Sequence, residues 1–128
     1  MDPGETVEQA ALREAHEEIG LATDSVRVLG ALTPINIPVS GFRLHPIVGT
    51  ADADARLRPA DAEVARIIAV PLQDLLDPAA IVWRTVSRAG RTFDVPAFPI
   101  SDADVWGATA MVLAELLVLL GWTGPDGL

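Results

Sequence analysis

The sequence has no cysteine and no lysine. Without cysteine, the chain cannot form disulfides, thiolate zinc sites or a cysteine nucleophile. All nine basic residues are arginines, and eighteen acids give a formal net charge of −9. A chain this acidic lacks the basic stripe that holds a nucleic-acid backbone, so we expect no nucleic-acid partner. A small phosphorylated molecule remains compatible with this charge, because a bound divalent cation reverses the local field.

The sequence also lacks a long uncharged apolar run. Its most apolar segment, residues 105–120, contains Glu115 and is shorter than the ~20 residues that span a bilayer. The first five residues have neither the basic nor the apolar part of a secretory signal. We therefore expect a cytoplasmic protein without a membrane partner.

The chain has 128 residues, of which 50% are hydrophobic. This length is typical of one domain, and this composition is sufficient for a packed core. We expect a single domain over residues 1–122, followed by a flexible tail at 123–128 that is rich in glycine and proline.

Residues 6–19 predict a helix that Thr6 caps and Gly20 ends. The following pattern predicts strands at 25–32 and 42–50, separated by a loop at 33–41, and a long loop at 51–61. Residues 64–70 are an apolar run of the length of a strand, and residues 71–76 predict a short helix.

The last third of the chain predicts a hairpin and a long helix. Residues 81–87 and 92–98 flank the turn sequence RAGR. The helix is expected over 101–120, capped by Ser101 or Asp102 and ended by Gly121. This order of elements predicts the α+β class, with helices packed on a mixed sheet.

Three acids lie on one face of the first predicted helix. Glu14 and Glu18 are four residues apart, and Glu17 is three residues from Glu14. Like charges at this spacing destabilise a helix by roughly 0.2–0.5 kcal/mol per pair, and bound Mg²⁺ or Mn²⁺ would remove that repulsion. Arg13 is four residues before Glu17 and can orient it. Taken alone, the glutamates fit a solvated helix face better than a metal site.

The wider string changes this interpretation. Glu5, seven intervening residues and then residues 13–21, REAHEEIGL, resemble the Nudix box, G-x5-E-x7-R-E-U-x-E-E-x-G-U. The box positions from Glu5 onward match, with Ala15 where a larger aliphatic residue is more common. The resemblance implies a Nudix-like α/β/α sandwich, in which a mixed sheet is packed between helices.

The opening glycine of the box would lie six residues before Glu5, which is upstream of Met1. We therefore expect a Nudix domain that is truncated at its N-terminus and lacks its first strands. Missing strands would leave an open sheet edge, through which a homodimer could form.

Further segments are similar to the coenzyme A pyrophosphatase subfamily. They are SGFRLHPIVG at 40–49, DAEV at 61–64, VPLQDLLDP at 70–78 and VWGATA at 105–110. This resemblance implies hydrolysis of the diphosphate linkage of coenzyme A or acyl-CoA to 3′,5′-ADP and 4′-phosphopantetheine or its acyl form.

The resemblance also implies roles for single residues. Mg²⁺ or Mn²⁺ would be held by Glu14, Glu17 and Glu18. Glu17, Glu18 and Glu63 are the catalytic candidates, with Glu17 or Glu63 taking a proton from water. Glu5 and Arg13 would orient the glutamates of this cluster without binding the ion themselves.

Substrate-binding residues stay unassigned, although Arg43 and Arg84 are candidates for phosphate contacts. Two alternatives stay open for the function. The substrate can be ADP-ribose or a nucleoside triphosphate, or the chain can be a remnant that binds a metabolite without turnover.

Overall fold

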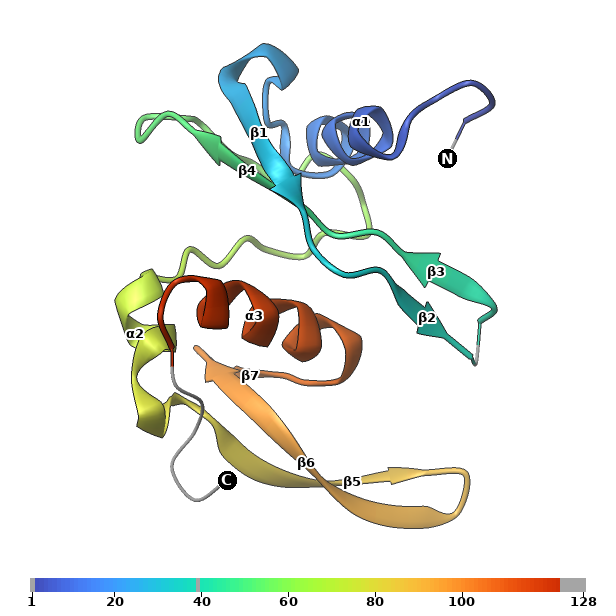
Figure 1. Cartoon of the computed structure of the whole chain (residues 1–128), viewed down its shortest axis with the longest axis vertical. Helices are drawn as coiled ribbons and strands as arrows, with labels where there is room; N and C mark the ends of the chain where they lie inside the picture. Colours follow the sequence, from blue (N-terminus) through green and yellow to red (C-terminus); the bar gives the residue numbers. More distant parts are fainter. Residues whose placement is uncertain (1, 39, 123–128) are drawn as a thin grey trace. The chain divides into compact units, whose positions relative to one another are not determined.

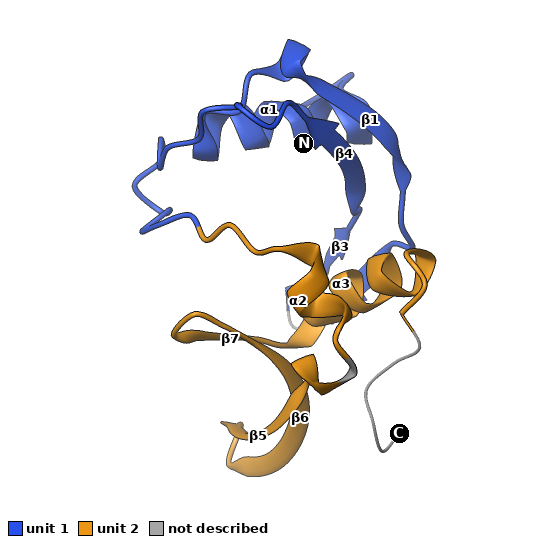
Figure 2. Ribbon diagram, turned by 90° about the vertical axis from the view of Figure 1, so that its left-hand side faces the viewer, with its two compact units in different colours: residues 1–67 blue, residues 68–128 orange. Residues whose placement is uncertain are grey.

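The computed structural model describes residues 2–38 and 40–122 (Figure 1). The chain divides into two compact units, Met1–Ile67 and Ile68–Leu128 (Figure 2). The expected domain at 1–122 therefore comprises two units, and the expected tail at 123–128 lies outside the described residues. The α+β class is confirmed. None of the helices in the described ranges has the length and apolar character needed to cross a membrane.

The first unit begins with helix α1, Val7–Ile19. Thr6 caps it by accepting a hydrogen bond from the backbone N–H of Gln9, and the Gln9 side chain accepts one from the backbone of Thr6. Gly20 ends the helix with a φ of 71°, which a residue with a Cβ adopts only at a cost. Both predicted helix ends are confirmed.

Four strands follow a short 3₁₀ turn at Thr23–Ser25. They form two antiparallel pairs: β1, Val26–Ala31, with β4, Ile47–Ala51, and β2, Ile35–Ile37, with β3, Phe42–Leu44.

Two predictions for this region are wrong. The expected loop at 33–41 contains β2, because Gly41 turns the chain with a φ of 71° and lets β2 pair with β3. The expected strand at 42–50 is broken between Leu44 and Ile47, where Pro46 has no N–H to donate to a neighbouring strand.

The segment from 52 to 71 is irregular. The strand expected at 64–70 does not form there, because an apolar run of this length becomes a strand only when a neighbouring strand pairs with it. The expected loop at 51–61 is confirmed from residue 52 onward, and it is tied to the end of α1. The N–H of Arg58 donates to the carbonyl of Ile19, and that of Ala60 donates to the carbonyl of Glu18, both at 2.9 Å.

The second unit contains the remaining elements. In chain order they are helix α2 (Leu72–Leu76) and a 3₁₀ turn (Pro78–Ala80), then the antiparallel strands β5 (Val82–Arg88), β6 (Arg91–Ile100) and β7 (Ala103–Val105), and finally helix α3 (Gly107–Leu119). The predicted hairpin is confirmed, and Ala89 and Gly90 both have positive φ, as a tight hairpin turn requires. The described strands thus form three antiparallel sheets, where the sequence had suggested one mixed sheet.

Helix α3 begins later than predicted. Ser101 has a φ of 58° and lies in the turn between β6 and β7, so neither it nor Asp102 caps the helix. The extra strand β7 forms because Phe98 pairs with Val105 across this turn. Trp106 is the N-cap residue and makes no side-chain capping bond. Gly121, with a φ of 100°, ends the helix region as predicted.

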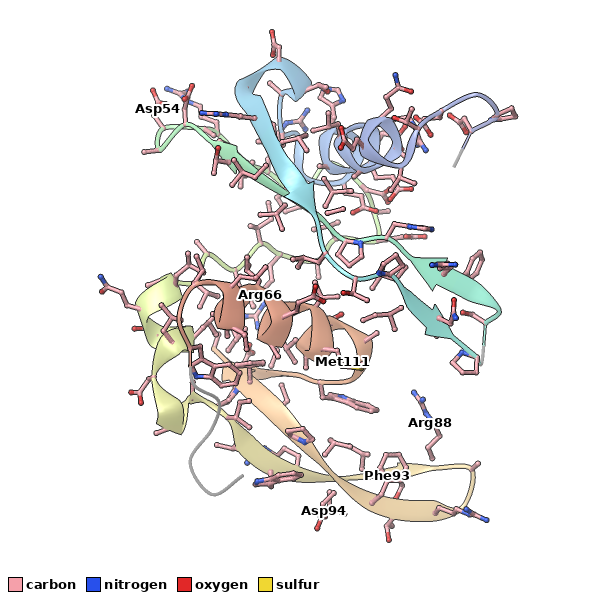
Figure 3. All side chains as sticks on the ribbon, in the orientation of Figure 1. Asp54, Arg66, Arg88, Phe93, Asp94 and Met111 are labelled. Atoms are coloured by element: carbon pink, nitrogen blue, oxygen red, sulfur yellow. The ribbon has the colours of Figure 1, made fainter. Side chains whose placement is uncertain are left out.

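The core of the second unit is small. Phe98 and Leu117 are almost completely buried, and Leu75, Ala110 and Trp122 pack with them. On helix α3 of the same unit, Met111, labelled in Figure 3, is exposed.

Candidate active site

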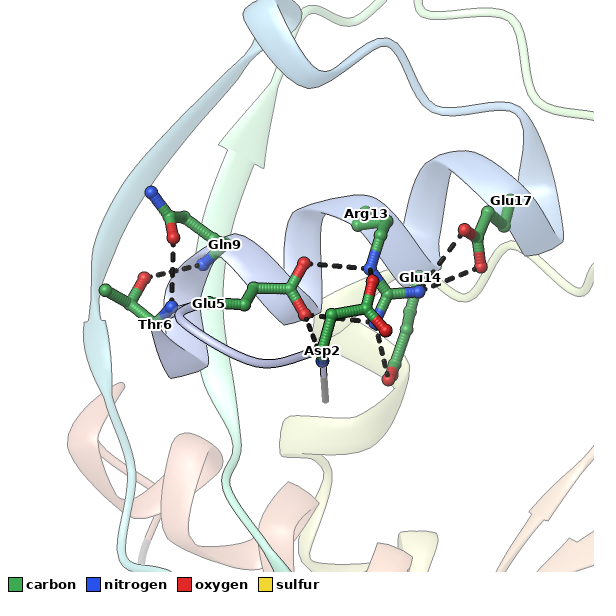
Figure 4. A network of polar contacts seen from close by, with 7 residues as sticks. All are labelled: Asp2, Glu5, Thr6, Gln9, Arg13, Glu14 and Glu17. Atoms are coloured by element: carbon green, nitrogen blue, oxygen red, sulfur yellow. Dashed lines mark hydrogen bonds and ion pairs between the residues drawn. The ribbon is translucent and has the colours of Figure 1, made fainter.

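Arg13 is the centre of a network of ion pairs on α1 (Figure 4). Its Nε lies 2.8 Å from Oε2 of Glu5, and its Nη2 lies 3.1 Å from Oε1 of the same carboxylate. Its Nη1 lies 3.1 Å and 3.2 Å from the two oxygens of Glu17. A guanidinium is planar and has several donors in a fixed arrangement, so one arginine can hold two carboxylates in defined positions.

The Glu5 carboxylate is the best-anchored member of this network. Its side chain is 13% exposed, and Oε1 also accepts a hydrogen bond from the backbone N–H of Asp2. The hydrogen bond from Arg13, reinforced by the one from Asp2, lowers the pKa of Glu5 to about 2. The hydrogen bonds to Glu5 and Glu17 raise the pKa of Arg13 above its ordinary value. Glu5 therefore stays charged at any pH at which the protein is expected to work.

Of the three predicted metal ligands, Glu14 and Glu18 are less constrained than Glu17. The Glu14 side chain is 54% exposed and has one oxygen 3.9 Å from Arg13, and Glu18 is exposed. All three glutamates lie on α1 with one-turn spacing. Within residues 2–38 and 40–122, however, no three acidic or histidine side chains already converge on one point where a metal could sit.

The donor set nevertheless suits Mg²⁺ or Mn²⁺. Carboxylate oxygens are the ligands that these ions prefer, and the glutamates are accessible from solvent. Both oxygens of Glu17 contact Arg13, so binding an ion there would require Glu17 to share them. Glu14 and Glu18 carry no such close ion pair among the described residues.

Glu63 lies in the irregular segment that is tied to α1. Its N–H donates to Oδ1 of Asp61 at 2.9 Å, and it is three residues after Ala60, which is bonded to the carbonyl of Glu18. Three residues of extended chain reach at most about 11 Å. The structure thus brings the segment that carries Glu63 to the C-terminal turn of α1. Nothing in the sequence indicated this, because the tie uses backbone groups.

A pocket of about 300 Å³ lies beside Glu14, between α1 and β3. It is lined by Val7, Ala10, Ala11, Glu14, Phe42, Arg43, Leu44 and His45. Of the two arginines predicted to be candidates for phosphate binding, Arg43 lines this pocket. Arg84, in the second unit, is paired with Asp104 at 3.0 Å.

The comparisons with known proteins identify the family of this chain. The NUDIX domain family matches residues 1–88. A protein named Uncharacterized Nudix hydrolase NudL from Enterobacter sp. (strain 638) is 33% identical over 112 residues, which cover 88% of this chain and 58% of that protein. The NudL of Photorhabdus laumondii is 37% identical over 106 residues, covering 83% of this chain and 56% of that protein.

The chain thus spans little more than half the length of these two relatives. The family match includes the whole Arg13 network and the three glutamates of α1. The predicted resemblance is therefore confirmed at the level of the family: the chain belongs to the Nudix family.

Proposed function

We propose that this chain carries the catalytic helix of a metal-dependent pyrophosphohydrolase that cleaves the diphosphate linkage of coenzyme A or acyl-CoA. The products would be 3′,5′-ADP and 4′-phosphopantetheine or its acyl form. The observation that carries the proposal is the network in which Arg13 fixes Glu17 beside Glu14 and Glu18 on α1. Family membership supports the reaction class.

Glu14, Glu17 and Glu18 would hold Mg²⁺ or Mn²⁺. When bound, the ion would neutralise the diphosphate and make a water molecule more acidic. The chain's own contribution is to fix the ligands. Glu5 stays charged and anchors Arg13, and Arg13 in turn restricts the side-chain conformation of Glu17.

Hydrolysis also needs a group that accepts a proton from the attacking water. The water oxygen forms a bond to one phosphorus as the bond between that phosphorus and the bridging oxygen breaks, and the bridging oxygen leaves with the other phosphate. Glu17 and Glu63 are the two candidate bases. The docking of residues 58–60 on the end of α1 supports Glu63 as a candidate, because it keeps this glutamate close to the helix.

The coenzyme A assignment depends on the segments at 40–49, 61–64, 70–78 and 105–110. A substrate panel tests it with coenzyme A, an acyl-CoA, ADP-ribose and a nucleoside triphosphate at equal Mg²⁺. We expect the highest kcat/KM for coenzyme A or the acyl-CoA. A clear preference for ADP-ribose or a triphosphate would leave the reaction class standing and replace the substrate.

One observation favours a second candidate, a module that binds a nucleotide without hydrolysing it. Both oxygens of Glu17 are paired with Arg13, and no three acids or histidines of the described residues converge on one point. Turnover of the purified protein with Mg²⁺, compared with the same protein in a chelator, separates the two. Binding without metal-dependent turnover would favour the module.

A further inference from the structure

The pocket between α1 and β3 combines an arginine and a phenylalanine with a small apolar wall and Glu14. We propose, building on the proposed function, that it holds the nucleoside phosphate half of the substrate, with Arg43 binding a phosphate and Phe42 stacking on the base. The sequence alone left substrate-binding residues unassigned.

Arg43 is the arginine that lines the pocket, and it has no acidic partner among the described residues. Arg13 and Arg84 are both held by carboxylates, whereas Arg27 also lacks an ion pair in the part of the chain that the structure describes but does not line the pocket. In the described ranges Arg43 makes neither an ion pair nor a side-chain hydrogen bond. It is exposed, so its guanidinium is free to form the paired contacts that suit a phosphate.

The position of β3 explains how residues from both of its faces reach one pocket. Neighbouring side chains of a strand point to opposite faces, so Phe42 and Leu44 share one face and Arg43 lies on the other. Among the described residues β3 pairs only with β2, which leaves its second edge unpaired. The lining of the pocket includes residues from both faces of this short strand.

Phe42 is the aromatic residue that lines the pocket. Phe42 follows the turn at Gly41 and is 73% exposed, so its ring is accessible to a ligand. Aromatic rings stack on any of the nucleobases, and such stacking contributes strongly to nucleotide binding. The ring therefore has the exposure and the position that a base platform needs.

The helix side of the pocket connects it to the proposed metal site. Val7, Ala10 and Ala11 supply a small apolar wall, and Glu14 belongs both to the pocket and to the proposed metal ligands. A phosphate on Arg43 would thus lie next to the acidic face of α1. The volume of about 300 Å³ is at the lower end for small-molecule sites, so it suits one nucleotide half and not a whole dinucleotide-sized substrate.

Titration calorimetry with ADP and with adenosine tests this assignment in a buffer with EDTA, so that metal binding plays no part. For Arg43→Ala we expect ADP affinity to fall at least tenfold and adenosine affinity to stay within twofold of wild type. For Phe42→Ala we expect both ligands to lose affinity at least fivefold. The matched control is Arg27→Ala, which removes an exposed strand arginine of the same unit that does not line the pocket. This variant should bind both ligands like wild type.

The proposal is overturned if Arg43→Ala binds ADP like wild type, if it weakens adenosine and ADP equally, or if Arg27→Ala has the same effect. Melting curves of the variants check that each is folded. These measurements are independent of hydrolysis. Loss of metal-dependent turnover with intact Arg43-dependent binding would overturn the proposed function alone, and turnover without Arg43-dependent binding would overturn the subsite alone.

Discussion

Arg13 binds Glu5 and Glu17 at the same time, with its closest contacts at 2.8 Å and 3.1 Å. Glu5 precedes α1 and Glu17 lies near its C-terminal end. The Arg13 side chain therefore connects the segment before the helix to the acidic face of the helix. The positive charge also offsets the repulsion between acids that share this face. The helix can therefore fold before the proposed ion is present.

The first prediction concerns pH. The pKa of Glu5 is about 2 in the folded protein and near 4.5 when the chain unfolds, so its ion pair stabilises the fold above pH 4.5 and this contribution is lost as the pH falls towards 2. Glu5→Gln should be less stable than wild type at pH 6, and the difference should shrink to nothing near pH 2. Urea unfolding at a series of pH values measures it. A stability difference that does not change between pH 6 and pH 2 would contradict the assignment.

A second prediction concerns packing under α1. Ala15 lines a cavity of about 160 Å³ between α1 and the strand pair β1 and β4. Ala15→Leu adds three carbons there, and at about 0.8 kcal/mol per buried CH₂, reduced for incomplete burial, we expect a gain of about 1–2 kcal/mol in the free energy of unfolding. Thermal and urea unfolding measure this gain.

Gly49, on the wall of the same cavity, gives the opposite control. A Cβ at this position would lie 2.9 Å from Cγ1 of Val26, whose β-branched side chain has few alternative conformations. Gly49→Ala should therefore cost about 1–2 kcal/mol. Ala15→Leu would contradict the description of the cavity if it destabilised the protein as much as Gly49→Ala.

A third prediction tests the tie between the irregular segment and α1. Ala60→Pro removes the N–H that donates to the carbonyl of Glu18. If this tie delivers Glu63 to the site, kcat should fall about tenfold or more while KM changes little. Ala53→Pro is the control, because the N–H of Ala53 makes no hydrogen bond in the described structure. Equal kinetic effects of the two prolines would show that the tie does not position a catalytic group.

Local signals predicted part of this fold well. The ends of α1 followed from Thr6 and Gly20, and the hairpin followed from Ala89 and Gly90, because capping and tight turns depend on residues close in sequence. The start of α3 was missed because Ser101 resembles a cap but takes a positive φ in a turn, which only pairing with β7 requires.

In the candidate site too, contacts between residues close in sequence could be predicted, and contacts between distant segments could not. The spacing of Arg13, Glu14 and Glu17 on one helix was sufficient to predict that Arg13 contacts Glu17. The tie of Ala60 to Glu18 and the pocket at Arg43 depend on contacts between distant segments, the first through backbone atoms that leave no trace in residue type. Sequence periodicity carries no information about such contacts.

The central claim is that the acidic face of α1 performs metal-dependent hydrolysis, and Glu18→Gln tests it most directly. This substitution removes one charge while it keeps the size of an exposed side chain, so the melting temperature should stay close to that of wild type. Glu8→Gln, at an exposed position in the first turn of the same helix, is the matched control. Initial rates on coenzyme A at saturating Mg²⁺ should fall at least 100-fold for Glu18→Gln and less than twofold for Glu8→Gln. Turnover near the wild-type rate in Glu18→Gln would contradict the account.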